Sequence, residues 1–454
     1  MGIFQSIPQY NSYLLNNKLS LFDEAKIRRN IDEIAKQLYE MDINKDENKY
    51  LILSCIYGAF LGDSIGSACE FKNTSNDNHL LIFSPEGFIF LPGEVTDDSE
   101  MAISAAFAYI DSINEDPSKI QNLIYFYFCI WSNSNPKDMG TATYNALSSW
   151  KNDSIEKTKF DNKIARYYNS KSLANGFLMR ISTFIAYYYY KNIDKIKNTI
   201  EAYFKEGINN NDLTDDMMDL LEDIYIESSK NIEITHPNYE NAVSGSVFTL
   251  MTLTGIIMKD ASLILLLFTT ISSSKNFGSF CDSKKENKKD KSDIQKKYSQ
   301  IINDIKNNKV IDFYKNMGYY IHAFHLSVYF LNKYQEMGKN QDKDLYYKIM
   351  CEICDFGGDT DTNCAIVGTL IGPLIGYKNF RKELFEIFIK FIPEERSLFN
   401  SAFMFIYVNY LEEKFVLKKN DEIKQEGKFN YTTKKKLEEF FGALNNQKSE
   451  NNSK

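Results

Sequence analysis

The sequence has few prolines, no paired-cysteine pattern and no long apolar run. Eight prolines in 454 residues leave long helices largely unbroken. Seven cysteines without a pairing pattern indicate a reducing compartment rather than a disulfide scaffold. The first residues lack the basic and apolar regions of a secretory signal. The apolar runs at 261–271 and 364–377 are too short to span a bilayer. These absences predict a cytoplasmic protein without a membrane span.

Positively charged residues are fewer than negatively charged ones. Lysine and arginine number 53 against 61 acidic residues, which gives a formal net charge of −8. No long basic stripe runs through the part expected to be ordered, so nucleic acid is not expected as the main partner. Apolar residues make up 43% and charged residues 25%, which is typical of a globular protein. The expected form is a monomer.

The dominant sequence period is helical. Apolar residues recur at three- and four-residue steps, and few stretches alternate as strands do. This pattern predicts an all-α protein with roughly fifteen or more helices. The clearest helical segments are residues 49–66, 99–110, 241–258, 318–334 and 382–392.

Composition divides the chain into one large domain with polar ends. Residues 1–48 form a polar N-terminal extension with one amphipathic stretch near Phe22–Met41, and residues 416–454 form a charged tail. The main domain, residues 49–415, contains a lysine-rich segment at 274–298 that is nearly free of aliphatic side chains. Such a segment buries too little apolar surface to offset its ordering entropy, so a disordered insertion is predicted there.

Two acidic clusters each precede an apolar helix. In the first, which contains Thr96, Asp97 or Asp98 sits where a helix N-cap belongs, and capping alone is the simpler interpretation. The second, Gly357 to Asn363, alternates aspartate and threonine after two glycines, which exceeds what capping requires. Clustered carboxylate and hydroxyl oxygens are ligands for hard cations such as Mg²⁺ or Mn²⁺. Four carboxylates brought together without a cation would repel one another.

A third acidic site lies on the first apolar helix. Small residues around Gly62 indicate that this helix approaches another backbone closely. Asp63 and Glu70 are seven residues apart, two turns along one face. Taken alone, the segment predicts a packing helix with exposed acids.

These three segments together resemble the ADP-ribosylglycohydrolases. Residues 58–71 are similar to the family's first-helix motif, residues 93–101 to its Thr-Asp-Asp motif, and residues 357–376 to its Gly-Gly-Asp-Thr-Asp-Thr signature. Weaker matches follow in the expected order, and the resemblance spans about residues 50–412 apart from the lysine-rich segment. The weaker matches are Trp131–Thr143, Asn175–Arg180 and Thr235-His236.

The resemblance implies an all-α orthogonal helix bundle with two Mg²⁺ ions, for which Mn²⁺ can substitute, at the bottom of a cleft. It also implies roles for particular residues. Glu70 would be a switchable ligand or a substrate contact, and Asp97 or Asp361 would accept a proton from the attacking water, a choice left open here. The implied metal ligands are Thr96, Asp97, Asp98, Asp359, Asp361 and Thr362, and the implied substrate contacts are Glu70, Asp138, Gly140, Asn175, Gly176 and His236.

The activity implied by the resemblance is hydrolysis of the glycosidic bond between ADP-ribose and a modified acceptor, such as an arginine side chain of a protein. The substrate would be an ADP-ribosylated protein and the product ADP-ribose. Two alternatives are a non-catalytic ADP-ribose-binding protein of the same fold and a metal-dependent phosphohydrolase. The intact acidic clusters argue against the first, and the glycine-rich signature argues against the second. Phe177 departs from the family, which often has a small residue there, and it is expected to reshape the diphosphate pocket or wall it.

Overall fold

The structure is a computed structural model that describes most of the chain between residues 24 and 417. The described residues are 24–70, 90–113, 115–150, 155, 157–207, 212–285, 293–309, 311–337, 342, 344–392 and 399–417. The first part of the predicted extension and residues 418–454 of the predicted tail lie outside them. The described residues hold no β-strand, only one isolated β-bridge between Ala174 and Tyr319. The prediction of an all-α fold is confirmed.

α-Helices occur throughout the described residues. In chain order they are α2 (Glu24–Glu40), α3 (Glu47–Gly66), α4 (Asp97–Ser112), α5 (Ile120–Ser132), α6 (Thr141–Leu147), α7 (Lys163–Asn169), α8 (Ile181–Lys191), α9 (Ile193–Ala202), α10 (Asp215–Ile232), α11 (Tyr239–Met258), α12 (Ala261–Ser273), α13 (Lys275–Lys284), α14 (Ile294–Lys306), α15 (Tyr320–Met337), α16 (Leu345–Phe356), α17 (Thr360–Ile375), α18 (Lys382–Lys390) and α19 (Phe403–Glu412). All five segments with the clearest helical period are helices.

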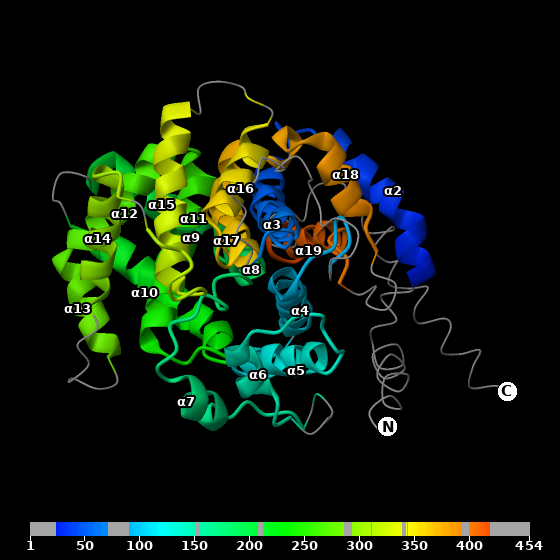
Figure 1. The fold of residues 1–454 in the computed structure, drawn as a ribbon, viewed down its shortest axis with the longest axis horizontal. Helices are drawn as coiled ribbons and strands as arrows, with labels where there is room; N and C mark the ends of the chain where they lie inside the picture. Colours follow the sequence, from blue (N-terminus) through cyan, green and yellow to red (C-terminus); the bar gives the residue numbers. More distant parts are fainter. Residues whose placement is uncertain are drawn as a thin grey trace, which may run out of the picture.

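Helices α3 and α17 form the centre of the bundle and touch backbone to backbone (Figure 1). Glycines at every fourth position of α3, Gly58, Gly62 and Gly66, face α17, which presents Gly368 and Gly372 in return. A Cβ added at Gly58 would lie 2.3 Å from the carbonyl oxygen of Gly368, and one added at Gly368 would lie 2.1 Å from that of Gly58. Only glycine permits this approach. The close contact predicted from the small residues of α3 is therefore confirmed.

The other helices surround this pair. Helices α15, α11 and α16 pack against α17, helices α19 and α8 pack against α3, and α4 contacts both. Figure 1 shows α10 to α15 on one side of the pair and α2 and α18 on the other, with α5 and α6 running across below. The buried apolar side chains form one continuous core. The N-termini of α4 and α17 consequently meet inside the bundle.

Helix α11 is long and apolar enough to cross a membrane by length and composition, but 89% of its apolar window is buried inside the protein. It packs against α10, α12 and α17. The prediction that no apolar run is long enough to span a bilayer rested on the runs at 261–271 and 364–377 and left out this helix. Its burial on all sides is that of a core helix.

The predicted disordered insertion at 274–298 is wrong for the residues that the structure describes. Residues 275–284 form α13 and residue 294 begins α14, while 286–292 lie outside the described part. Phe277 and Phe280 are buried, and Phe277 stacks on Tyr298 with ring centroids 6.4 Å apart. The lysines dominate the composition, yet the few aromatic residues recur at helical spacing and bury one face.

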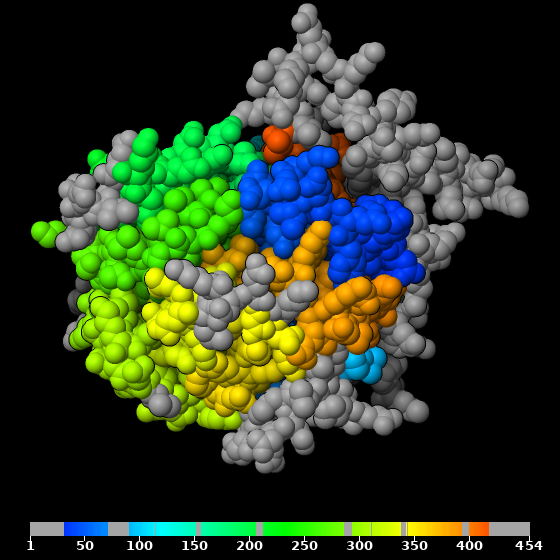
Figure 2. All heavy atoms as spheres, turned by 90° about the horizontal axis from the view of Figure 1, so that it is seen from above, coloured from blue at the N-terminus to red at the C-terminus, as the bar shows by residue number. Residues whose placement is uncertain are grey.

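The predicted polar extension also joins the fold sooner than expected. Its amphipathic stretch forms α2, which packs on α18, and Figure 2 shows the two helices side by side at the surface. Ile34 and Leu38 belong to the core, and the hydroxyl of Tyr377 donates a hydrogen bond to the carbonyl oxygen of Leu38 at 2.7 Å. The boundary predicted at residue 48 therefore moves toward the N-terminus.

The glycine contact predicts a large difference between two similar substitutions. Gly368→Ala adds a Cβ against the backbone of α3, whereas Gly255→Ala in α11 meets the Cδ1 of Ile264 at 3.0 Å, a side-chain end that can move. Gly368→Ala should lower the free energy of unfolding by about 3 kcal/mol through overpacking. Gly255→Ala should stay within about 1 kcal/mol of the wild type, because alanine is the better helix former. Urea unfolding of both variants measures this, and equal stability would show that the α3–α17 contact is not tight.

Candidate active site

A cleft of about 650 Å³ opens where the N-termini of several helices meet. Every residue predicted for the site lines it except Thr96, which is fully buried beside it. The cleft also takes residues that the sequence analysis did not name for it, among them Tyr168, Asn169 and Met317. The structure thus brings together residues from 70 to 362 at one place.

Two helix N-termini carry the acidic clusters. The N-cap of α4 is Thr96, whose hydroxyl accepts the N–H of Asp98 at 3.3 Å, so the prediction of Asp97 or Asp98 at this position is wrong and both aspartates lie in the first turn. Asp359 takes the N-cap position of α17, and Asp361 lies in the first turn. The positive end of a helix dipole favours carboxylates there. Gly357 and Gly358 precede this turn with φ of +72° and +81°, a conformation that favours glycine.

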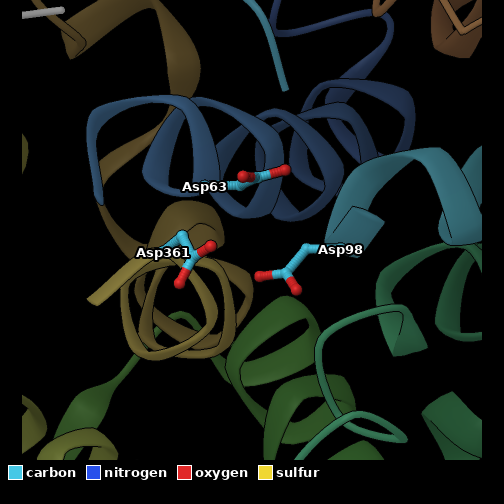
Figure 3. Close-up of side chains that lie close together, drawn as sticks. All are labelled: Asp63, Asp98 and Asp361. Atoms are coloured by element: carbon cyan, nitrogen blue, oxygen red, sulfur yellow. The ribbon is translucent and has the colours of Figure 1, made fainter. Parts of the chain in front are cut away.

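The carboxylates converge from three helices. Figure 3 shows Asp63 from α3, Asp98 from α4 and Asp361 from α17 pointing toward one another. Their oxygens lie within 4.8 Å of one another, and so do those of Glu70, Asp359 and Asp361, which makes Asp361 common to both groups. Among the described residues these are the groups of acidic, histidine or cysteine side chains close enough to share an ion.

The donor set fits hard divalent cations. All the side chains offer oxygen, which is the ligand that Mg²⁺ and Mn²⁺ prefer. The Oδ2 atom of Asp98 is buried and has no hydrogen-bond partner among the described residues, while its Oδ1 accepts the hydroxyl of Thr362 at 3.1 Å. A buried carboxylate oxygen without a partner is costly unless something positive faces it.

Burial and mutual repulsion shift the titration of the cluster. Burial, and then the neighbouring carboxylates, raise the pKa values of Asp97, Asp98 and Asp361 well above their usual range. Burial and then the charge of Asp359 raise the pKa of Glu70 to about 8. These shifts have the sign expected of carboxylates that lack a positive counterion. A cation between them would reverse the shift.

Asp63 is a site residue that the sequence analysis missed, because the prediction of exposed acids on α3 is wrong for it. Asp63 is 0% exposed, and both of its carboxylate oxygens accept the N–H of Thr96 at 3.1 Å. Its Oδ2 also accepts the N–H and the hydroxyl of Ser99, at 3.2 and 2.6 Å. These bonds tie the first turn of α4 to α3. The signal was available: a helix that is apolar on all sides is buried, and so is an aspartate within it.

Apart from its carboxylates, which include Asp138, the cleft is lined by neutral groups. The side-chain amide of Asn175 donates to Oδ2 of Asp359 at 2.7 Å, and the N–H of Asn175 donates to the carbonyl oxygen of Gly318 at 2.8 Å. Gly140 is the N-cap of α6, and its N–H lies 3.4 Å from Oδ2 of Asp97. Among the described residues that line the cleft there is no lysine or arginine. An anion bound there must be held by neutral donors such as amides, hydroxyls and the imidazole of His236, by helix N-termini or by cations.

The departure at Phe177 does not affect the cleft wall. Its side chain is 1% exposed and packs between His236 and Tyr320, with ring centroids 5.9 and 6.1 Å away. Phe177 is not among the residues that line the cleft. The expectation that it walls the diphosphate pocket is therefore wrong, and its link to the cleft is its contact with the ring of His236.

Comparisons with known proteins agree with the sequence motifs. A profile of the family described as ADP-ribosylglycohydrolase matches residues 44–388. A protein of Acanthamoeba polyphaga mimivirus, provisionally named an ADP-ribosyl glycohydrolase, is 26% identical over 347 residues, which cover 71% of this chain and 86% of that protein. A solved structure titled "ADP-ribosylglycohydrolase-related protein complex" covers 82% of this chain and 99% of its own, with 15% identity and a TM-score of 0.49.

The raised carboxylate pKa values predict how stability depends on pH and metal. A group whose pKa is higher in the folded state stabilises the fold at low pH, and this contribution is lost as pH rises through the folded pKa. The stabilising contribution of Asp63 should be lost as the pH rises through about 6, and that of Glu70 as it rises through about 8. In EDTA the melting temperature should therefore fall between about pH 5 and about pH 8. Mg²⁺ should restore the melting temperature at the upper end of this pH range. A melting temperature that changes with neither pH nor Mg²⁺ would contradict the assignment of a buried carboxylate cluster.

The bonds of Asp63 predict a second effect on stability. Asp63→Asn replaces one acceptor oxygen with an amide donor and removes the charge, so one bond from the N–H of Thr96 is lost and the bonds to the remaining oxygen no longer go to a charged acceptor. In Mg²⁺ at neutral pH the free energy of unfolding should fall by about 3 kcal/mol, against about 1 kcal/mol for Ser99→Ala, which removes a single bond. Denaturant unfolding measures both. Wild-type stability in Asp63→Asn would mean that α4 does not depend on this anchor.

Proposed function

Because this chain belongs to the ADP-ribosylglycohydrolase family, a family that acts on ADP-ribose linkages, we propose that it cleaves the glycosidic bond between ADP-ribose and a protein side chain with the aid of two Mg²⁺ ions. The observation that carries the proposal is that Asp361 lies close to Asp98 in one group of carboxylates and to Asp359 in the other, that all three line one cleft, and that the buried Oδ2 of Asp98 lacks a partner among the described residues.

The carboxylates divide into ligands and a base. Asp361 belongs to both groups of close oxygens, so Asp361 would hold the ions together with Asp98, Asp359 and Thr362. Thr96 can add a ligand through the second lone pair of its hydroxyl oxygen, since the first accepts the N–H of Asp98. Bound there, Mg²⁺ would lower the pKa of a water toward neutrality and bind the ribose hydroxyls.

Asp97 is the better proton acceptor of the two considered. It lines the cleft, lies outside both groups of close oxygens and accepts the N–H of Gly140. A carboxylate that is not committed to an ion can take a proton from the attacking water. Glu70 lies at the other side of Asp361, within reach of an ion or of the ribose hydroxyls. Cleavage through an oxocarbenium-like state needs such negative charge near the anomeric carbon.

The charge of the cleft favours a cationic acceptor. Glu70, Asp97 and Asp138 line the cleft, and no lysine or arginine does so among the described residues. A guanidinium group would be attracted to these carboxylates and could be bound by two parallel hydrogen bonds. We therefore propose ADP-ribosylated arginine in a protein as the substrate and ADP-ribose as the product. The non-catalytic alternative would leave the whole set of buried carboxylates without a use.

Release of ADP-ribose tests the function. The protein is incubated in Mg²⁺ or in EDTA with peptides ADP-ribosylated on arginine or on serine, and the products are identified by mass spectrometry. The arginine peptide should release ADP-ribose in Mg²⁺ and not in EDTA. Asp361→Asn should lower turnover about a hundredfold or more, because it removes charge at the shared position. Asp282→Asn is the matched control, because the side chain of Asp282 is exposed on α13, and it should leave turnover unchanged.

Each other outcome identifies a different function. Binding of ADP-ribose without release from any peptide would favour the non-catalytic alternative. Release of AMP or phosphate would favour a phosphohydrolase. Wild-type turnover in Asp361→Asn would refute the assignment of the ion site, and preference for the serine peptide would refute the acceptor.

A further inference from the structure

A buried arginine connects the two segments that form the neutral part of the cleft. Arg180 is 0% exposed and stands at the start of α8, below the turn at Gly176. Its Nη1 donates to the carbonyl oxygen of Gly176 at 2.6 Å, and its Nη2 donates to the hydroxyl oxygen of Thr235 at 2.7 Å. Its Nε donates to Oδ1 of Asn231 at 2.9 Å. The guanidinium therefore holds the turns at Gly176 and at Thr235 together.

The arginine bond determines what the hydroxyl of Thr235 can do. A guanidinium only donates, so the hydroxyl oxygen must be the acceptor of that bond. The same hydroxyl lies 2.7 Å from Nδ1 of His236. Thr235 is 0% exposed, and among the described residues His236 Nδ1 is the acceptor within reach of its hydrogen. A buried hydroxyl hydrogen without an acceptor is unfavourable, so the hydroxyl donates to Nδ1.

This hydrogen bond fixes the proton on the other ring nitrogen. If Nδ1 accepts, the neutral imidazole must carry its hydrogen on Nε2. Burial and then the positive charge of Arg180 hold the pKa of His236 well below its usual range, so the ring stays neutral. Burial lowers the pKa of Arg180 to about 9, which still leaves it charged at neutral pH.

The Nε2 atom of His236 is the free end of this chain. It has no hydrogen-bond partner among the described residues, although the side chain is 1% exposed and lines the cleft. Gly176 covers it so closely that an added Cβ would lie 3.2 Å from Nε2 and 2.9 Å from Cε1. A buried N–H donor without a partner beside a cleft indicates an acceptor that arrives with a ligand.

We propose that Arg180, acting through Thr235, is a positioning residue that keeps the proton of His236 on Nε2, so that the cleft offers a fixed hydrogen-bond donor to ADP-ribose. The identity of the ligand rests on the proposed function, while the tautomer rests on the hydrogen bonds alone. The ligand atom that meets His236 must then be an acceptor, such as a phosphate or hydroxyl oxygen. A ligand with a donor there is rejected, because two donors would face each other.

Nuclear magnetic resonance of histidine reads the tautomer directly. The chain has four histidines, so ring ¹⁵N signals from a histidine-labelled sample are few, and His236→Gln identifies the signal of His236. The wild type should show a protonated Nε2 and an unprotonated Nδ1. Thr235→Val keeps the shape and removes the hydroxyl, so Nδ1 should gain protonated character. Thr235→Ser keeps the hydroxyl and should restore the wild-type spectrum. A protonated Nδ1 in the wild type would overturn the proposal.

Binding and turnover test the consequence for the ligand. In Mg²⁺, Thr235→Val should weaken ADP-ribose binding by calorimetry roughly tenfold, the size of one lost hydrogen bond. KM for the ADP-ribosylated peptide should rise similarly while kcat stays within about twofold, because the contact is made in ground and transition states alike. Thr235→Ser should recover both values. Unchanged affinity in Thr235→Val would overturn the positioning role.

The two proposals can fail separately. A wild-type protein that does not bind ADP-ribose but shows the Nε2–H tautomer would refute the proposed function and support the positioning chain. Arg180→Lys adds a direct test of the arginine, because an ammonium group cannot donate to Gly176 and Thr235 in the same fixed fork. It should shift the His236 signals in the same direction as Thr235→Val. Wild-type signals in Arg180→Lys would remove Arg180 from the chain.

Discussion

The contact between α3 and α17 is the constraint on which the site depends. Glycines at Gly58 and Gly368 let the two backbones touch, and a Cβ at Gly66 would lie 2.5 Å from the Cα of Asp361. This closeness sets the carboxylate of Asp361 against that of Asp63 on α3 and that of Glu70, which lies in the turn after α3 rather than two helical turns along one face as predicted. Larger residues at the glycines would separate the helices and, with them, the carboxylates. Packing and chemistry therefore share the same residues.

The site is electrostatically unfavourable without a partner. Carboxylates that are buried together raise one another's pKa values, and the fold contains this repulsion rather than removing it. The helix N-termini of α4 and α17 supply part of the compensation, and the hydrogen bonds to Asp63 supply another part. What is left uncompensated, chiefly the Oδ2 of Asp98, faces the place where a cation would bind. Strain of this kind is typical of functional sites.

The acidic and the neutral half of the cleft are held in place in different ways. The acidic half is positioned by helix ends and backbone contact, whereas the neutral half is held by a single buried guanidinium that bonds to Gly176 and Thr235. Arg180 has no carboxylate partner in these bonds, and it lies over the ring of Phe128 at 4.8 Å. An anionic ligand thus meets amides and a neutral imidazole rather than a salt bridge, which preserves room for cations to balance its charge.

The sequence by itself determined the helical class and the approximate places of the longest helices, because apolar periodicity is a local property. It also predicted the acidic clusters, because two glycines and alternating aspartates are visible in a short segment. The small residues around Gly62 likewise predicted the close approach of α3 to another backbone. The disordered insertion was wrong because a lysine count hides the spacing of Phe277 and Phe280, which matters only once Tyr298 and Phe324 offer a surface.

Tertiary structure alone decided which side chains meet. The burial of Asp63 could be inferred from its apolar helix, but its place in the site follows from the bonds that α4 donates to it, whose donors are more than thirty residues away in the chain. The tautomer of His236 likewise depends on Arg180, which is 55 residues from the threonine between them. Local periodicity carries no information about such distant hydrogen bonds, because they exist only when burial removes water as the competing partner.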